Sequence, residues 1–485
     1  MSTPKPVNAY PVKEPYTWVF IRSLDGAALY EVKEPTLSEE ERQALEGVKK
    51  LLINRVGPSM NGEVEKWLEK AFKKLLPKAL SKLKKEKREA VKEAEGKLLY
   101  YVKRDMLGYG KLDPLIRDPN VEDVSVVGPG RVYVWHRLYG NMPSSVVLDE
   151  NEVRELAFKL SYRAGGQVSA SRPFFDGRLP EGHRVHVVLR EVSPRGESID
   201  IRRHVASPYT FIDLINLGTL SSELAAYMWL MVEFKRGIIF TGETGAGKTT
   251  TLNAAASFIP PEAKVVTVEE AREVNIPHRC WVSLVTREMP VDGWLRVTLF
   301  DLVKQALRQR PDYLIVGEVR GEEAYTLFQA LSLGHGGLST LHAESVEAAV
   351  KRLTSKPMDI PRHLIGVAGC FVHLAKHQTE AGLARRVVEV VEPVGDRFNA
   401  VWRRGMESPA ESQALLKAAY LAGKDGEWLK EELEARAKLL SWMSSKASRL
   451  SQEEKFKLVA DFVRRYTLNP EELKREARLE GVAVA

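Results

Sequence analysis

The apolar positions of this chain follow different spacings in different regions, and each change of spacing marks a boundary. Between residues 106 and 205, alternating apolar and polar residues in "VEDVSVVGPGRVYVWHRLYG" flank a Gly-Pro-Gly turn, which predicts a strand, a turn and a second strand. A helical pattern follows at 151–164, and strand patterns follow at 183–191 and 197–204. We therefore expect a small α/β domain at 106–205.

Residues 222–400 contain four apolar runs, "GIIFTG", "KVVTVEE", "DYLIVGEVR" and "GLSTLHA". They alternate with helical patterns at 248–258, 300–309, 322–333 and 345–355. Alternating strands and helices predict a mainly parallel sheet with helices on both faces. We interpret residues 206–221 as a linker with a short helix.

The two ends of the chain are predicted to be mainly helical. Residues 1–35 are Pro-rich with a short strand at 17–22, and Ser38 and Glu41 form a capping box that begins the helical part of a 1–105 extension. Pro77 should break or kink an amphipathic stripe there. Residues 401–485 are interpreted as a helical C-terminal extension. The stripe consists of Leu68, Phe72, Leu75, Leu76, Ala79, Leu80 and Leu83.

Composition describes a soluble globular protein of several domains, with 485 residues, 44% hydrophobic and 28% charged. No apolar run approaches the roughly 18–20 residues that would span a bilayer. The first residues lack the apolar core of a signal peptide, so we expect a cytoplasmic protein unless something recruits it elsewhere. Cys280 and Cys370 are its two cysteines, which excludes a disulfide framework and a cysteine-based zinc site.

The formal net charge of +7 is concentrated in one segment. Residues 63–104 carry 14 Lys/Arg and 7 Asp/Glu, so the rest of the chain is neutral in balance. This segment is either a helical bundle with a solvated charged surface or a docking surface, and the sequence favours neither.

The segment "FTGETGAGKTT" contains the spacing GxxxxGK[ST] after a strand and before a helix. Glycines let the backbone N–H groups surround phosphate oxygens, Lys248 reaches the outer phosphates, and the Thr249 hydroxyl reaches Mg²⁺. The motif predicts a phosphate loop for ATP or GTP. Its candidate binding residues are Gly242, Glu243, Thr244, Gly245, Ala246, Gly247, Lys248, Thr249 and Thr250.

Carboxylates at the ends of two other predicted strands complete this site. "DYLIVGEVR" has Gly317 where many phosphate-loop enzymes have an aspartate, and Glu318 follows it. "VVTVEEAREV" supplies Glu269 and Glu270. The carboxyl ends of parallel strands share one edge of a sheet, so we expect Glu269, Glu318 and Lys248 to meet there. The predicted Mg²⁺ site comprises Thr249, Glu269 and Glu318.

Together, "GETGAGKTTTLNA", "TVEEAREV", "ALRQRPDYLIVGEVR" and "GHGGLSTLHAES" resemble the secretion ATPase superfamily. Its members drive type II secretion, type IV secretion, type IV pili and the archaellum. "LDPLIRDPNVEDVSVVGPGRVYV" and "RRVVEVVE" resemble its archaeal branch, and the absence of a four-cysteine insertion agrees with that branch or with the pilus and type IV secretion branches. The resemblance covers roughly residues 100–395. It implies a RecA-like ATPase domain preceded by a smaller α/β domain.

The resemblance makes His335 and His342, in "GHGGLSTLHA", candidate sensors of the γ-phosphate, and favours His342 at the end of a strand. A metal pair lacks a third ligand nearby, and His335 could instead be a packed core histidine. The family's acidic box usually ends in Glu-Asp, so Glu269 matches it while Glu270 departs from it.

In the family, arginines of the small domain help to stabilise the transferred phosphoryl group. Arg184 and Arg202 match such positions, while Arg172 and Arg203 match less well. Solubility at strand edges is the alternative role, and it suits Arg203 best. Further candidates for contacts between strands or subunits are Arg287, Arg308, Arg310 and Arg320.

The resemblance implies a homo-hexameric, ATP-hydrolysing motor that assembles an archaeal type IV pilus-like filament or archaellum, or powers type II-like secretion. Glu269 would position the attacking water and Glu318 would hold Mg²⁺ through water, and these roles could be exchanged. Implied partners are a polytopic membrane platform protein, pilin or archaellin machinery, and acidic lipid at the inner face of the cell membrane.

The alternative is a motor that translocates nucleic acid on the same fold. The pI of about 9.0 would suit it, but the basic segment has few aromatic residues on which bases could stack, so no nucleic-acid partner is expected. An inactive structural homologue is disfavoured because Lys248, Thr249, Glu269 and Glu318 are all present.

Overall fold

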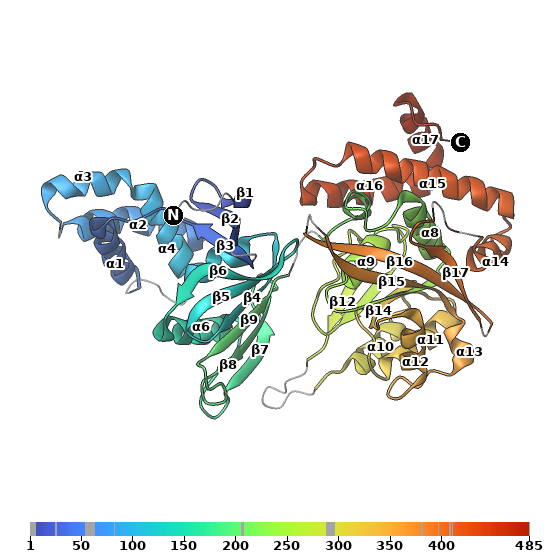
Figure 1. Cartoon of the computed structure of the whole chain (residues 1–485), viewed down its shortest axis with the longest axis horizontal. Helices are drawn as coiled ribbons and strands as arrows, with labels where there is room; N and C mark the ends of the chain where they lie inside the picture. The colour runs from blue at the N-terminus through green and yellow to red at the C-terminus, as the bar shows by residue number, and fades with distance from the viewer. Residues whose placement is uncertain are drawn as a thin grey trace. The chain divides into compact units, whose positions relative to one another are not determined.

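The computed structural model divides into two compact units, Met1–His204 and Val205–Ala485 (Figure 1). It describes residues 6–24, 27–53, 64–81, 83–204, 208–287, 296–379, 382–395, 397–406, 409 and 411–484. Among the helices described, none combines the length and the apolar character needed to cross a bilayer.

A nine-stranded sheet forms the first unit, in the order β1-β2-β3-β6-β5-β4-β9-β8-β7. The three N-terminal strands join the rest through a short parallel contact at Tyr30 and Ser144, and the other neighbours are antiparallel. The strands are β1 (Pro6–Lys13), β2 (Thr17–Leu24), β3 (Ala27–Lys33), β4 (Val121–Val127), β5 (Gly130–His136), β6 (Gly140–Leu148), β7 (Phe174–Arg178), β8 (Arg184–Val188) and β9 (Ser198–Arg202).

Four helices between β3 and β4 form a bundle with its own apolar core. The predicted amphipathic stripe supplies much of that core, because Leu68, Phe72, Leu75, Leu76, Ala79 and Leu80 are buried. The Ser38–Glu41 capping box is present, with Glu41 N–H donating to Ser38 Oγ at 3.2 Å and Ser38 N–H to Glu41 Oε2 at 2.7 Å. The helices are α1 (Glu39–Ile53), α2 (Val64–Leu80), α3 (Lys85–Glu93) and α4 (Glu95–Met106), followed by a 3-10 turn (Gly110–Leu112), α5 (Asp113–Arg117) and α6 (Glu150–Arg163).

The second unit is built on an eight-stranded sheet in the order β12-β11-β13-β14-β10-β15-β16-β17. Neighbours from β12 to β15 are parallel, and the β15–β16 and β16–β17 pairs are antiparallel. The strands are β10 (Gly237–Gly242), β11 (Val265–Glu269), β12 (Trp281–Val285), β13 (Tyr313–Val316), β14 (Gly336–His342), β15 (Ala368–Thr379), β16 (Gly382–Val394) and β17 (Arg397–Arg403). β10 and β13 are buried throughout, as expected of parallel strands covered on both faces.

Helices pack on this sheet and continue to the C-terminus. Their bounds are α7 (Phe211–Asn216), α8 (Ser222–Glu233), α9 (Lys248–Ala256), α10 (Leu299–Arg308), α11 (Glu323–Ser332), α12 (Val346–Thr354), α13 (Arg362–Ile365), α14 (Gln413–Leu421), α15 (Gly426–Lys446), α16 (Gln452–Leu468) and α17 (Pro470–Leu479). One apolar core contains residues of α7, α8, β10 and the C-terminal helices, so these helices share the core of the sheet.

The structure confirms the predicted fold class, an α/β chain with a RecA-like parallel sheet preceded by a smaller α/β unit and with helices at both ends. It also differs from the sequence pattern in four places. Residues 6–33 form three strands of the first sheet, whereas one strand at 17–22 was expected. α2 continues three residues beyond Pro77, which therefore does not break it. β17 extends to Arg403, past the start of the predicted helical end.

The fourth difference concerns residues 206–221, interpreted from sequence as a linker. Phe211, Ile212 and Leu214 of α7 are buried in the core of the second unit, because this short helix packs against α9 and α15. Residues 206 and 207 lie outside the described part. The finer boundaries at 1–105, 106–205, 206–221, 222–400 and 401–485 stay predictions.

Candidate nucleotide-binding site

The phosphate loop connects the end of β10 to the start of α9, as its sequence predicted. Gly245 and Gly247 have φ of +74° and +95°, conformations that side chains with a Cβ rarely adopt. A Cβ on Gly242 would lie 2.4 Å from the Leu374 carbonyl oxygen of the adjacent strand. The loop therefore needs its glycines, and it directs the first N–H groups of α9 toward any bound anion.

Lys248 folds back over this loop. Its Nζ donates to the carbonyl oxygens of Gly242 and Glu243, both at 2.9 Å. Burial lowers the pKa of the Lys248 ammonium, the Glu318 and Glu273 carboxylates act to raise it, and the Lys376 charge adds to the lowering. The lysine is thus held by neutral carbonyl groups within the electrostatic reach of two carboxylates.

Two further cations contact the loop, and no sequence motif indicated them. Lys376 of β15 donates to the Thr244 carbonyl at 3.1 Å, and Arg385 of β16 donates through Nε to the Gly245 carbonyl at 2.8 Å. They are cross-strand neighbours in the β15–β16 pair. The valines of "RRVVEVVE" could have indicated a strand, because β-branched residues favour strands, but nothing local indicated that this strand would reach a loop 140 residues earlier.

The predicted carboxylates lie at the ends of β11 and β13, which are adjacent in the sheet. Glu269 is buried, and its Oε1 accepts from the N–H groups of Glu273 at 2.8 Å and Val274 at 2.8 Å. A Cβ on Gly317 would lie 3.0 Å from Glu269 Cγ, so the glycine makes room for this glutamate. Glu318 is exposed and its charge acts on Lys248.

Sequence reasoning missed Glu273, whose carboxylate also acts on Lys248. The loop that carries it is fixed by Glu269 and by Asn253 of α9, whose Nδ2 donates to the Glu273 carbonyl at 3.1 Å. Its spacing four residues after Glu269 in "EEARE" was the available signal.

His335 and His342 lie at opposite ends of β14, the first just before the strand and the second at its last residue. His342 pairs with Gly242 of the loop, and its Nδ1 lies 3.4 Å from Thr244 Oγ1. His335 comes just before β14, and its Nδ1 donates to the Pro311 carbonyl at 2.7 Å. Six residues of extended chain separate the two ends by about 20 Å. The structure therefore brings His342 to the phosphate loop and leaves His335, which is half-buried, at the other edge of the sheet.

The four candidate arginines of the second unit lie in three different places. Arg320 follows Glu318 and forms an ion pair with Glu270. Arg308 and Arg310 precede β13 and so lie at the edge opposite the phosphate loop. The Arg287 backbone forms a bridge with Val297.

Arginines proposed from the first unit are held by acids of their own sheet. Arg184 makes two bonds to Asp176, at 3.1 and 2.6 Å, and Arg202 donates to Asp123 at 2.9 Å. These two arginines are register neighbours on β8 and β9 and remain half-exposed.

The two weaker candidates are placed differently from each other. Arg203 donates to the Val121 carbonyl at 2.7 Å, and burial lowers the pKa of its guanidinium. Arg172 is exposed in the loop before β7.

The profile of the family described as Type II/IV secretion system protein matches residues 110–380. This match covers more than half of the chain and includes the phosphate loop, both predicted carboxylates and both histidines. The chain belongs to this family. The resemblance inferred from the four motifs is thereby confirmed.

Relatives of this type II/IV secretion system protein occur in archaea and bacteria. An uncharacterised protein of Methanocaldococcus jannaschii is 42% identical over 307 residues, which cover 62% of this chain and 55% of the relative. The chain thus spans about half the length of that relative. The type IV secretion system protein PtlH of Bordetella pertussis is 27% identical over 312 residues, covering 58% of this chain and 92% of PtlH.

Two solved structures are also similar to this family member. The VirB11 ATPase of the Brucella suis type IV secretion system, solved with sulphate, is 25% identical, covers 60% of this chain and 93% of its own, and has a TM-score of 0.30. The pilus retraction motor PilT, solved with ADP, is 18% identical, covers 56% and 80%, and has a TM-score of 0.41.

Proposed function

We propose that this chain is an ATP-hydrolysing motor that assembles an archaeal type IV pilus-like filament or archaellum, or drives type II-like secretion. The observation that carries the proposal is the convergence at one sheet edge of the phosphate loop, Lys248, the Glu318 and Glu273 charges and His342. Family membership supports the secretion class, and the relative at 42% identity comes from an archaeon.

The residues present fit a nucleotide with Mg²⁺. The glycine conformations leave the N–H groups at the start of α9 available to phosphate oxygens, and Lys248 would exchange two carbonyl partners for phosphate. Thr249 and Glu318 are the candidate residues to hold Mg²⁺, which would neutralise charge on the transferred phosphoryl group. Gly242 to Thr250 form the binding loop.

The carboxylates can take different roles in water activation, Mg²⁺ binding and positioning of the loop. Glu269 was predicted to contact water or Mg²⁺, and its hydrogen bonds to the N–H groups of Glu273 and Val274 support a positioning role for it as well. We propose that Glu318 and Glu273 share the water-activating and metal-holding roles, with His342 reporting the state of the γ-phosphate through Thr244.

We propose that the chain assembles into a homo-hexameric ring. Its proposed partners are a polytopic membrane platform protein and pilin or archaellin machinery. Within such a ring, Arg184 and Arg202 would leave their aspartates to neutralise phosphate charge once the first unit closes on the nucleotide. Arg172 and Arg203 remain weaker candidates, because Arg203 is held against the Val121 carbonyl.

The bundle of the first unit offers a means of recruitment to the inner face of the cell membrane. The outer face of α2 carries five exposed lysines, and the acid between the first and the last of them, Glu69, is paired with Lys103 of α4. They recur at spacings of three and four, so they lie on one side of the helix. Such a face would attract anionic lipid or an acidic platform loop, and the attraction would weaken with salt. The lysines are Lys66, Lys70, Lys73, Lys74 and Lys78.

Hydrolysis by the whole chain tests the proposal. Lys248→Ala should reduce the ATP turnover rate at least about 100-fold, because the residue compensates charge on the transferred phosphoryl group. Lys417→Ala, an exposed lysine of α14, is the matched control and should leave turnover unchanged. Equal turnover in both variants would refute the site. Strong stimulation by DNA, but not by lipid, would favour the nucleic-acid motor.

A further inference from the structure

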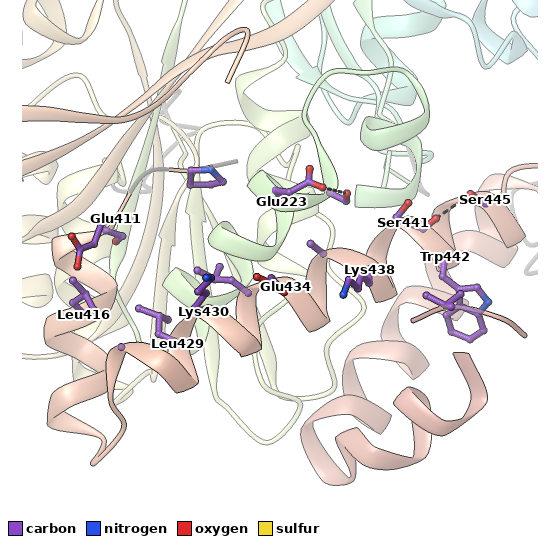
Figure 2. A pocket seen from close by; sticks show the side chains of 17 residues that line it. Glu223, Glu411, Leu416, Leu429, Lys430, Glu434, Lys438, Ser441, Trp442 and Ser445 are labelled. Carbon is purple, nitrogen blue, oxygen red and sulfur yellow. Dashed lines mark hydrogen bonds between the residues drawn. The ribbon is translucent and has the colours of Figure 1, made fainter. Parts of the chain in front are cut away.

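A groove of about 1010 Å³ lies along α15 in the C-terminal part of the second unit (Figure 2). α15 forms one wall from Gly426 to Ser445, which is about 30 Å at 1.5 Å per residue. The start of α8, the segment before α14 and residues near the C-terminus complete the lining. Its apolar surface comes from Leu416, Leu429, Leu433, Ala437, Trp442 and Val482.

The α15 wall has the shape of a helix-binding surface. Side chains at every fourth position of α15 line the groove: the first two are large, Leu429 and Leu433, and the next three are small, Ala437, Ser441 and Ser445. Rows with this spacing form the ridges and grooves by which helices pack, and small residues allow a close approach. A groove of this length suits a helix of several turns better than a compact small molecule.

Charged side chains follow the same wall in an alternating order. Lys430, Glu434 and Lys438 are exposed on successive turns, and among the described residues no ion pair or hydrogen bond is recorded for these side chains. Glu223 lies across the groove on α8, where it accepts from Ser222 Oγ at 3.1 Å (Figure 2). The order along α15 is therefore positive, negative, positive above an apolar floor.

The groove belongs to a part of the chain that the family profile does not match. Apart from Ser222 and Glu223, its lining residues come after residue 380. In the described part of the chain, no hydrogen bond or ion pair joins them to the phosphate loop or to the carboxylates beside it, so nucleotide binding does not explain why this surface is apolar.

We infer that this groove binds an amphipathic helix of a partner protein, with acidic, basic and acidic side chains at i, i+4 and i+8 beside its apolar face. The apolar face would cover the floor, and the three charges would face Lys430, Glu434 and Lys438. Because the order of charges is the same in both directions, charge alone permits either orientation of the helix. Apolar area provides affinity, and the charges select the partner.

Two labelled helical peptides of about 18 residues test this inference by fluorescence anisotropy with the full-length chain. They share an apolar face and differ only in charge order, Glu–Lys–Glu in one and Lys–Glu–Lys in the other. The Glu–Lys–Glu peptide would form three attractive charge pairs with the groove, whereas the Lys–Glu–Lys peptide would form three repulsive pairs. The first peptide should therefore bind about tenfold tighter at low salt, and the difference should shrink at high salt. In a Lys430→Glu, Glu434→Lys, Lys438→Glu variant the preference should reverse.

Matched tryptophan variants locate the binding. Ser441→Trp should obstruct the groove and abolish peptide binding, whereas Glu431→Trp, at an exposed site of α15 outside the lining, should leave it intact. Lys248→Ala should bind the peptide normally, so this inference and the proposed ATPase can fail separately. Equal binding of both peptides, binding that survives Ser441→Trp, or no binding would overturn it. A self-association of the chain that Ser441→Trp disrupts would also overturn it, in favour of a second copy.

Discussion

Cations gather on both units of the chain, but different groups hold them. At the phosphate loop, Lys248, Lys376 and Arg385 donate to backbone carbonyls of the loop itself, and Lys376 in addition lies 3.8 Å from a carboxylate oxygen of Glu243. On the first sheet, Arg184 and Arg202 are paired with aspartates. A carbonyl is neutral, so exchanging it for phosphate brings a net gain of charge attraction, whereas an aspartate competes with phosphate as an anion. The first set is ready to bind, and the second set must first be released.

The largest effect on turnover should come from a carboxylate beside the phosphate loop. Glu318→Gln keeps the side-chain volume but removes the charge that acts on Lys248, so nucleotide should still bind while turnover falls about 100-fold or more. Binding of a fluorescent ATP analogue and phosphate release measure the two quantities. Glu322→Gln, an exposed acid beyond the site, is the control. Turnover close to that of the unaltered chain would remove Glu318 from the reaction.

Loss of the two cations of the β15–β16 pair, Lys376 and Arg385, should weaken nucleotide binding more than catalysis. Lys376→Ala and Arg385→Ala each remove a donor to a loop carbonyl and a positive charge beside the loop, and we expect affinity to fall about tenfold with a smaller change in kcat. Arg385→Lys should restore part of the affinity. A change confined to kcat would instead place these residues in the catalytic step and would contradict the view that they serve nucleotide binding.

The two ends of β14 offer a comparison within one strand. His342→Ala should lower the rate of ATP hydrolysis about threefold to tenfold, or uncouple hydrolysis from filament assembly, because it removes the ring beside Thr244. His335→Ala should leave turnover unchanged and lower thermal stability slightly, through loss of the bond to the Pro311 carbonyl. Turnover and melting temperature distinguish these outcomes. Equal loss of turnover in both variants would contradict the separation of the two histidines.

The smallest effects should come from the arginines that are already paired. Arg184→Ala and Arg202→Ala should lower kcat about fivefold and leave nucleotide affinity nearly unchanged. Asp176→Asn should free Arg184 from its competitor and raise kcat slightly, while Asp200→Asn, an acid of the same sheet that accepts from Ser125, is the matched control. If Asp176→Asn lowers kcat as much as Arg184→Ala, then the ion pair itself is the functional element.

The sequence predicted the site where local chemistry determines geometry. Glycine spacing fixes the phosphate loop, and the rule that parallel strands end at one edge brought Glu269, Glu318 and His342 to it. The same rule, applied to the start of a strand, would have placed His335 at the other edge. Lys376 and Arg385 could not be found this way, since their position depends on β15 lying beside β10, a pairing of distant segments.

The fold shows the same division between local and distant information. Capping and periodicity predicted α1 and the helices of the parallel sheet within a few residues. The addition of β1–β3 to the first sheet was not predictable, because those strands are more than 85 residues from β4 in sequence and meet β6 through a single register pair. Burial of α7 also depends on the C-terminal helices, which no local pattern reveals.

Arg436 determines where an independently folding fragment of this chain can end. It is 2% exposed on α15, forms ion pairs with Glu233 of α8 and with Glu432, and stacks on Trp229 and Tyr466 at 4.6 and 4.9 Å. A fragment cut at residue 380, where the match to the family profile ends, would expose Trp229 and leave Glu233 without its buried counterion. The C-terminal helices therefore cannot be removed without opening the core of the second unit, and a boundary placed at the end of the family match would separate this unit from part of its own interior.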